Sequence, residues 1–133
     1  MKKLLLFGLL LVFASCSKED DVPVEEPVVR YYVKYEVTFT TQHLNAPRNI
    51  TFTNEEGSQT ISITDYAKTI TWDRVYGPVD KNFVASLDCN VGSYEYTSNI
   101  HAKISMSRDK EPFVIKAEGS NTKSISLRYK IDF

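Results

Sequence analysis

Residues 30–41, RYYVKYEVTFTT, alternate apolar and polar side chains along their whole length. One parity carries Val33, Tyr35, Val37 and Phe39, and the other carries Lys34, Glu36, Thr38 and Thr40. Successive side chains of a β-strand point to opposite faces of its sheet, so this stretch predicts a strand with one buried face and one solvated face. The pattern decides the fold class because it recurs through the rest of the chain.

Seven further segments repeat the alternation. They are residues 49–53, 58–64, 69–76, 82–91, 97–107, 113–117 and 124–133. Turn-forming residues separate them, namely Asn54-Glu55-Glu56-Gly57, Gly77-Pro78, residues 108–112 and Gly119-Ser120-Asn121. Half-buried strands that follow one another at intervals of about 8–12 residues are typical of antiparallel sandwiches. We expect an all-β, antiparallel, immunoglobulin-like β-sandwich without helices, and a small barrel is the second option.

Cys89 is the only cysteine of the strand-rich region, so no disulfide can form within it. It shares its parity with four apolar residues, Phe83, Ala85, Leu87 and Val91. A reactive thiol needs an electropositive and partly exposed setting, and no residue nearby suggests one. We predict that Cys89 is a buried and unreactive core residue.

The first fifteen residues read as a secretory signal peptide. Lys2 and Lys3 precede an apolar run at residues 4–13, and the small residues Ala14 and Ser15 follow it. The run has about 10 residues, whereas a membrane-spanning helix needs roughly 20. A permanent membrane helix is therefore disfavoured.

The sequence Phe13-Ala14-Ser15-Cys16 resembles the lipobox of bacterial lipoproteins. The resemblance implies that the Cys16 thiol takes a diacylglycerol, that the chain is cut before it, and that the new amino group is acylated, for example with palmitate. Two or three acyl chains would anchor the protein stably. The alternative is an ordinary signal peptide that is cut nearby and leaves Cys16 unmodified.

An acidic cluster, Lys18, Glu19, Asp20 and Asp21, follows the cysteine. It resembles the export signal of surface lipoproteins from the Bacteroidota, which implies an outer-membrane anchor with the domain facing the cell surface. The alternatives are a solvated linker and a domain on the periplasmic face. We expect a signal peptide at residues 1–15, a lipidated tether at 16–29 and a β-sandwich domain at 30–133. Pro23 and Pro27 favour an extended tether of ~3 Å per residue.

The charge distribution argues against nucleic-acid binding. The chain has 16 basic and 17 acidic residues, and residues 17–29 hold five of the acids but a single lysine. The remainder is close to neutral, whereas nucleic-acid binding relies on cations that neutralise many phosphates.

Four short segments resemble the MmpS-type transport-accessory domain, a small immunoglobulin-like sandwich. They are VKYEV at 33–37, ITFTNEEG at 50–57, TW at 71–72 and FVASL at 83–87. The resemblance implies the fold and a transport-accessory role. The chain differs from that family because it carries a lipobox in place of a membrane helix and lacks a second domain cysteine.

No motif predicts catalysis, a metal or a cofactor. The two histidines, His43 and His101, have no second ligand at zinc-binding spacing. The carboxylates of Asp73 and Asp80 flank a turn, where solvated loop residues are commoner than a glycosidase pair. We therefore expect a non-enzymatic protein without a cofactor.

Four aromatic residues, Trp72, Tyr76, Tyr94 and Tyr96, are candidates for binding a sugar or a partner. The alternative places Trp72 in the core and the tyrosines at the sandwich ends. We expect a binding or accessory module of an outer-membrane or surface assembly, held to the membrane through Cys16 and contacting another envelope protein. The rival hypothesis is a carbohydrate-binding module that recognises a glycan.

Overall fold

The computed structural model describes residues 22–41, 47–65, 67–92 and 98–132. In these ranges the chain forms eight β-strands and no helix. The strands are β1 Tyr31–Thr41, β2 Arg48–Asn54, β3 Gly57–Ile63, β4 Thr69–Val79, β5 Val84–Val91, β6 Ser98–Arg108, β7 Val114–Asn121 and β8 Ser124–Lys130. Each predicted strand is present, with bounds shifted by a few residues.

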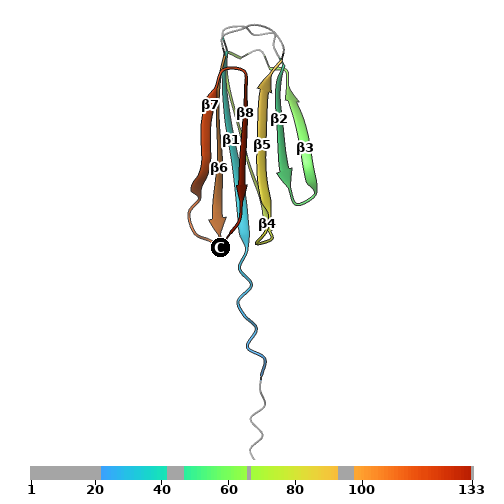
Figure 1. Ribbon diagram of the computed structural model, residues 1–133, viewed down its shortest axis with the longest axis vertical. Helices are drawn as coiled ribbons and strands as arrows, with labels where there is room; N and C mark the ends of the chain where they lie inside the picture. The colour runs from blue at the N-terminus through green and yellow to red at the C-terminus, as the bar shows by residue number, and fades with distance from the viewer. Residues whose placement is uncertain (1–21, 42–46, 66, 93–97, 133) are drawn as a thin grey trace, which may run out of the picture.

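Two four-stranded antiparallel sheets pack face to face, which confirms the predicted β-sandwich (Figure 1). Sheet A has the strand order β4-β1-β6-β7, and sheet B has the order β3-β2-β5-β8. β1 lies inside sheet A and pairs with β4 on one side and β6 on the other. The stretch whose alternation predicts the fold class is therefore an interior strand.

The buried parity of β1 is the predicted one. Val33, Tyr35 and Val37 are each 0% exposed, and the residues between them are half-buried. Leu87 and Cys89 of β5 face them from sheet B within the same core. Burying each large apolar side chain contributes roughly 1.5–3 kcal/mol, so the inner face of β1 is a main source of stability.

A hydrogen bond through the core joins the two sheets. The Tyr35 hydroxyl in sheet A donates to the carbonyl oxygen of Thr53 in sheet B at 2.6 Å. The Thr53 hydroxyl accepts a hydrogen bond from the Ser86 N–H at 2.9 Å and donates one to the Val84 carbonyl at 3.0 Å. Both bonds lie just past Phe52 and Leu87, where the backbone pairing of β2 with β5 ends. These contacts explain why Ser86, whose parity is opposite to that of the inward Leu87 and Cys89, is only 7% exposed.

Two predicted turns are wrong. Gly77-Pro78 does not end β4, because Gly77 and Pro78 form a bulge opposite Tyr32 and the strand continues to Val79. Gly77 has a φ of 135°, and a Cβ there would lie 2.8 Å from the Tyr31 carbonyl oxygen, so only glycine fits without distortion.

The second wrong turn is Gly119-Ser120-Asn121, because β7 continues through these residues to Asn121. The turn follows at Thr122 and Lys123, whose N–H groups donate to Asn121 Oδ1. Asparagine favours such turns because its side chain bonds the backbone just beyond it.

The sandwich has two distinct ends. The tether end holds the start of β1 and the ends of β4 and β6, and the far end holds Thr41, Arg48 and Val91 (Figure 1). The eleven residues of β1 run from one end to the other, a distance of about 35 Å. In the described ranges, no helix is long and apolar enough to cross a membrane.

Candidate functional site

The described part of the tether is exposed and makes few contacts with the domain. Val22, Val24 and Val28 are 77–89% exposed, and Val29 is the first tether residue that packs against the core. The tether continues away from the sandwich in line with β1 (Figure 1). It therefore joins the domain at one end.

A reciprocal pair of hydrogen bonds fixes this junction. The Arg30 N–H donates to Asp109 Oδ1 at 2.9 Å, and the Asp109 N–H donates to the Arg30 carbonyl at 2.7 Å. Asp109 follows β6 and has a φ of 54°, a left-handed conformation that aspartate tolerates better than most residues. Sequence reasoning missed this contact because Arg30 and Asp109 lie 79 positions apart.

Several sequence-predicted site residues lie outside the described residues. They are Cys16, Lys18, Glu19, Asp20, Asp21, His43, Tyr94 and Tyr96. The lipid attachment, the export signal and the role of the two tyrosines remain predictions.

The far end has a frame of backbone hydrogen bonds. The N–H of Thr41 donates to the Lys68 carbonyl at 2.9 Å, and the N–H of Gly92 donates to the Pro47 carbonyl at 2.9 Å. A third bond joins the Val91 N–H to the Lys123 carbonyl at 3.1 Å. The first bond continues the β1–β4 pairing of sheet A, and the other two continue the pairing of β5 with β2 and β8 in sheet B, at the end opposite the tether.

Arg48 is the main side-chain support of the far end. Its side chain is 0% exposed, and its guanidinium donates to the carbonyls of Asp65 at 2.8 Å and Ala67 at 2.7 Å. Burial lowers the pKa of Arg48, and the nearby Asp65 charge opposes that shift. Nε is buried without a hydrogen-bond partner. Arg48 therefore anchors the β3–β4 connection and is not a surface for ligands.

Trp72 and Tyr76 pack against the core. Both rings contact Phe52, with centroid distances of 5.2 Å for Trp72 and 5.1 Å for Tyr76. The ring centroid of Tyr76 also lies 6.1 Å from that of Tyr35. Burial raises the pKa of Tyr76, while Arg74 opposes the shift and Glu55 adds to it. Both rings are thus engaged with the core, although Trp72 and Tyr76 are each partly exposed.

Cys89 is buried, as predicted, with 1% of its surface exposed. Burial raises the pKa of its thiol to about 12, and the Asp88 charge adds to the shift. A thiol of this kind is neither a nucleophile nor a metal ligand at neutral pH.

His101 lies on the outer face of sheet A within a network of polar side chains. Its Nδ1 is 2.7 Å from Ser120 Oγ, and its Nε2 is 3.0 Å from Glu118 Oε1. Lys103 approaches the same carboxylate at 3.8 Å. Both ring nitrogens have a β7 partner, so His101 supports the pairing of β6 with β7.

Asp73 and Asp80 are too far apart to act as a glycosidase pair. Asp73 lies in β4, and Asp80 follows the end of that strand. At ~3.3 Å per residue they are separated by about 20 Å, whereas glycosidase carboxylates lie about 5–10 Å apart. In the described ranges, no group of three acidic, histidine or cysteine residues is placed to hold a metal.

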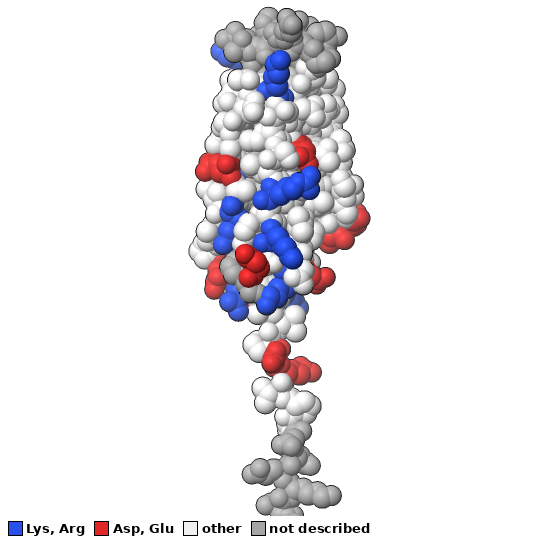
Figure 2. All heavy atoms as spheres, in the orientation of Figure 1, with Lys and Arg blue, Asp and Glu red and all other residues white. Residues whose placement is uncertain are grey.

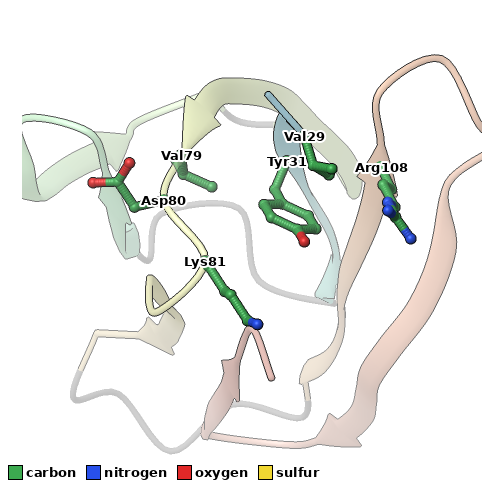
Figure 3. A pocket seen from close by; sticks show the side chains of 6 residues that line it. All are labelled: Val29, Tyr31, Val79, Asp80, Lys81 and Arg108. Carbon is green, nitrogen blue, oxygen red and sulfur yellow. The ribbon is translucent and has the colours of Figure 1, made fainter. Parts of the chain in front are cut away.

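The tether end holds a pocket of about 440 Å³. Its lining residues come from the tether, β1, β4, β6 and the connection after β4, and they are Val29, Tyr31, Val79, Asp80, Lys81 and Arg108 (Figure 3). Sequence reasoning gave no signal for this pocket, because its residues are spread over the chain and form no motif.

No protein-family model, curated protein or solved structure matches this chain.

Proposed function

We propose that the chain is a lipid-anchored protein of the cell envelope that acts as a non-catalytic binding or accessory module. The observation that carries the proposal is that the domain has two different ends. The tether joins one end, and the hydrogen-bonded frame of the far end lies about 35 Å away. An anchor at Cys16 would direct that far end away from the membrane. Surfaces held on a rigid scaffold in this way are suited to bind partners.

The anchor itself is proposed from the lipobox-like sequence that ends at Cys16. The acidic cluster from Lys18 to Asp21 supports a place in the outer membrane with the domain facing the cell surface, and the periplasmic face is the alternative. We further propose that the sandwich belongs to the immunoglobulin-like class, which two packed four-stranded antiparallel sheets support. An accessory role in a transport assembly rests on the MmpS-type resemblance.

The structural use of the most reactive side chains supports a non-catalytic role. Cys89 is in the core, and His101 is held by Glu118 and Ser120. The thiol is enclosed in the core, and both ring nitrogens of His101 have partners within the domain.

Site-specific photo-crosslinking in intact cells tests the proposal. A photo-reactive amino acid at Lys123 or Asn90, both exposed near the far end, should give a discrete crosslinked partner. The same amino acid at Lys110, an exposed residue near the tether end, is the matched control. Crosslinks that arise equally from Lys110, or that are absent from both far-end positions, would contradict a binding role for the far end.

The carbohydrate-binding alternative requires an aromatic contact to sugars. A glycan array distinguishes it, since stacking should give a saccharide signal that Tyr94→Ala or Tyr96→Ala abolishes. A signal of that kind would favour the carbohydrate-binding module over the protein-binding module.

A further inference from the structure

The pocket at the tether end is built on the terminal row of sheet A. Tyr31 begins β1 and lies in register between Val79, the last residue of β4, and Arg108, the last residue of β6. Residues directly opposite each other in an antiparallel pair share one face of the sheet. Val79 and Arg108 therefore flank the Tyr31 ring, and the nearly buried Val79 and Tyr31 give the pocket an apolar floor.

Two cationic side chains border this floor. Lys81 lines the pocket from the β4–β5 connection, and Figure 3 shows its ammonium below the Tyr31 ring and the Arg108 guanidinium to the right of that ring. The carboxylate of Asp80 points away from Lys81 in the same view. Both cations are exposed, and neither forms an ion pair with a carboxylate of the described residues.

Charged side chains of both signs surround the pocket. Figure 2 shows Lys and Arg side chains, with Asp and Glu side chains among them, over the lower half of the face that carries β8. Of the β8 cations, Lys130 is exposed, and the Arg128 guanidinium lies 3.9 Å from Asp88 Oδ2. Acidic residues also lie at this end, with Asp109 bonded by the Arg30 N–H and Asp132 by the Tyr129 hydroxyl, so the positive charge of the pocket comes from Lys81 and Arg108 themselves.

We propose that this pocket binds the phosphate group of an anionic lipid in the membrane to which the tether is attached. Arginine and lysine are the usual protein partners of phosphate, and arginine can engage two phosphate oxygens at once. The apolar floor would contact hydrocarbon groups of the lipid next to its phosphate. The location rests on the proposed function, because Val29 of the tether is itself a lining residue and the anchored chain would hold this end toward the bilayer.

The tether gives such a contact a high effective concentration. Residues 16–29 reach at most about 50 Å when fully extended, so the tether keeps the pocket within reach of the headgroups. Tethering of this kind converts a second contact into an intramolecular one, with effective concentrations in the millimolar range for short linkers. A site of modest affinity would therefore be occupied.

Vesicle co-sedimentation of residues 17–133, which lack the anchor, tests the inference. This form keeps every described contact, because the removed residues 1–16 lie outside the described residues and the strands begin at Tyr31. We expect it to bind phosphatidylcholine vesicles that contain phosphatidylglycerol and not vesicles of phosphatidylcholine alone. Each cation near an anionic surface is worth about fivefold in affinity, so Lys81→Ala with Arg108→Ala should weaken binding by roughly 25-fold.

The matched control removes two exposed cations from the far end, Lys68→Ala with Lys123→Ala. The two double variants have the same net charge, and both should keep the thermal unfolding midpoint of the unsubstituted protein. Retained vesicle binding in the control supports the pocket. An equal loss in both double variants would overturn it, because binding would then follow net charge alone.

Soluble glycerol 3-phosphate separates a lipid from a free anion. Binding of glycerol 3-phosphate at Lys81 and Arg108 without binding of vesicles would overturn the lipid assignment. If the protein binds neither glycerol 3-phosphate nor vesicles, the site itself is overturned. The result does not depend on acylation of Cys16, since residues 17–133 lack that residue. Failure of the inference and failure of the anchor are therefore measured separately.

Discussion

Arg30 and Asp109 exchange two hydrogen bonds across 79 positions of sequence, one at 2.9 Å from the Arg30 N–H and one at 2.7 Å to its carbonyl. The bonds tie the last residue before β1 to the residue after β6. They fix the direction in which the tether leaves the sandwich, and the proposed orientation of the domain depends on that direction.

Asp109 should tolerate asparagine but not alanine. Asp109→Asn keeps a side-chain oxygen for the Arg30 N–H and tolerates the φ of 54°, so we expect a change in the free energy of unfolding below ~0.5 kcal/mol. Asp109→Ala loses the bond and adds backbone strain, which should cost about 1–2 kcal/mol. Urea unfolding measures both values. Equal stabilities for the two variants would show that the reciprocal pair does not support the junction.

Alkaline pH should destabilise the domain through Cys89 and Tyr35. Burial raises the pKa of Cys89 from 9.0 to about 12 and that of Tyr35 from 10.0 to about 12. The unfolded chain releases these protons at lower pH than the folded chain does. The stabilisation is therefore complete below about pH 9 and is lost as the pH rises toward 12, with a slope of up to about 1.4 kcal/mol per pH unit for each group.

Cys89→Ala isolates the contribution of the thiol. It should remove the part of the slope that begins near pH 9 and leave the Tyr35 part, which begins near pH 10, as followed by urea unfolding at a series of pH values. A charged maleimide should fail to label Cys89 until the domain unfolds, and Cys89→Ser should cost on the order of 1–3 kcal/mol. Rapid stoichiometric labelling of the folded protein would contradict the buried position.

Arg48 should not accept lysine. The guanidinium reaches the carbonyls of both Asp65 and Ala67, whereas a single ammonium cannot match that geometry and would stay as a buried charge. We expect Arg48→Lys to cost about 2–4 kcal/mol and Arg48→Met to cost less, since methionine removes the buried charge and keeps much of the volume. Urea unfolding gives the comparison, with Lys123→Met as the exposed far-end control. Wild-type stability of Arg48→Lys would contradict the anchoring role.

The strands and their inward faces could be predicted because alternation is a local property of the sequence. Val33, Tyr35 and Val37 are buried as their parity requires, and so is Cys89. The two wrong turns have local causes as well. A Gly-Pro pair usually ends a strand, but Gly77 and Pro78 form a bulge inside β4. Gly119 lies within β7, where its missing side chain makes room for Ile125.

The strand order and the candidate sites could not be predicted, because they depend on contacts between distant parts of the chain. Alternation does not say that β1 pairs with β4 and β6, and nothing near Arg48 predicts its burial. Lys81 and Arg108 lie in polar segments without a motif, and only the pairing of Tyr31 with both Val79 and Arg108 places them around one pocket.

The acidic cluster after Cys16 should control exposure at the cell surface. Protease treatment of intact cells should remove the domain from the wild-type strain. Replacement of Glu19, Asp20 and Asp21 by alanine should protect it, because the export signal would be lost while the anchor stays. Unchanged protease sensitivity would show that the cluster is only a solvated linker.

The central claim is that Cys16 carries the lipid that holds this domain to the membrane. Metabolic labelling with an alkyne fatty acid, followed by detection of the purified protein, tests it most directly. The account predicts a labelled wild-type protein and an unlabelled Cys16→Ala protein, with Cys89→Ala labelled like the wild type as the matched control. Label that persists in Cys16→Ala, or that is absent from the wild-type protein, would contradict the account.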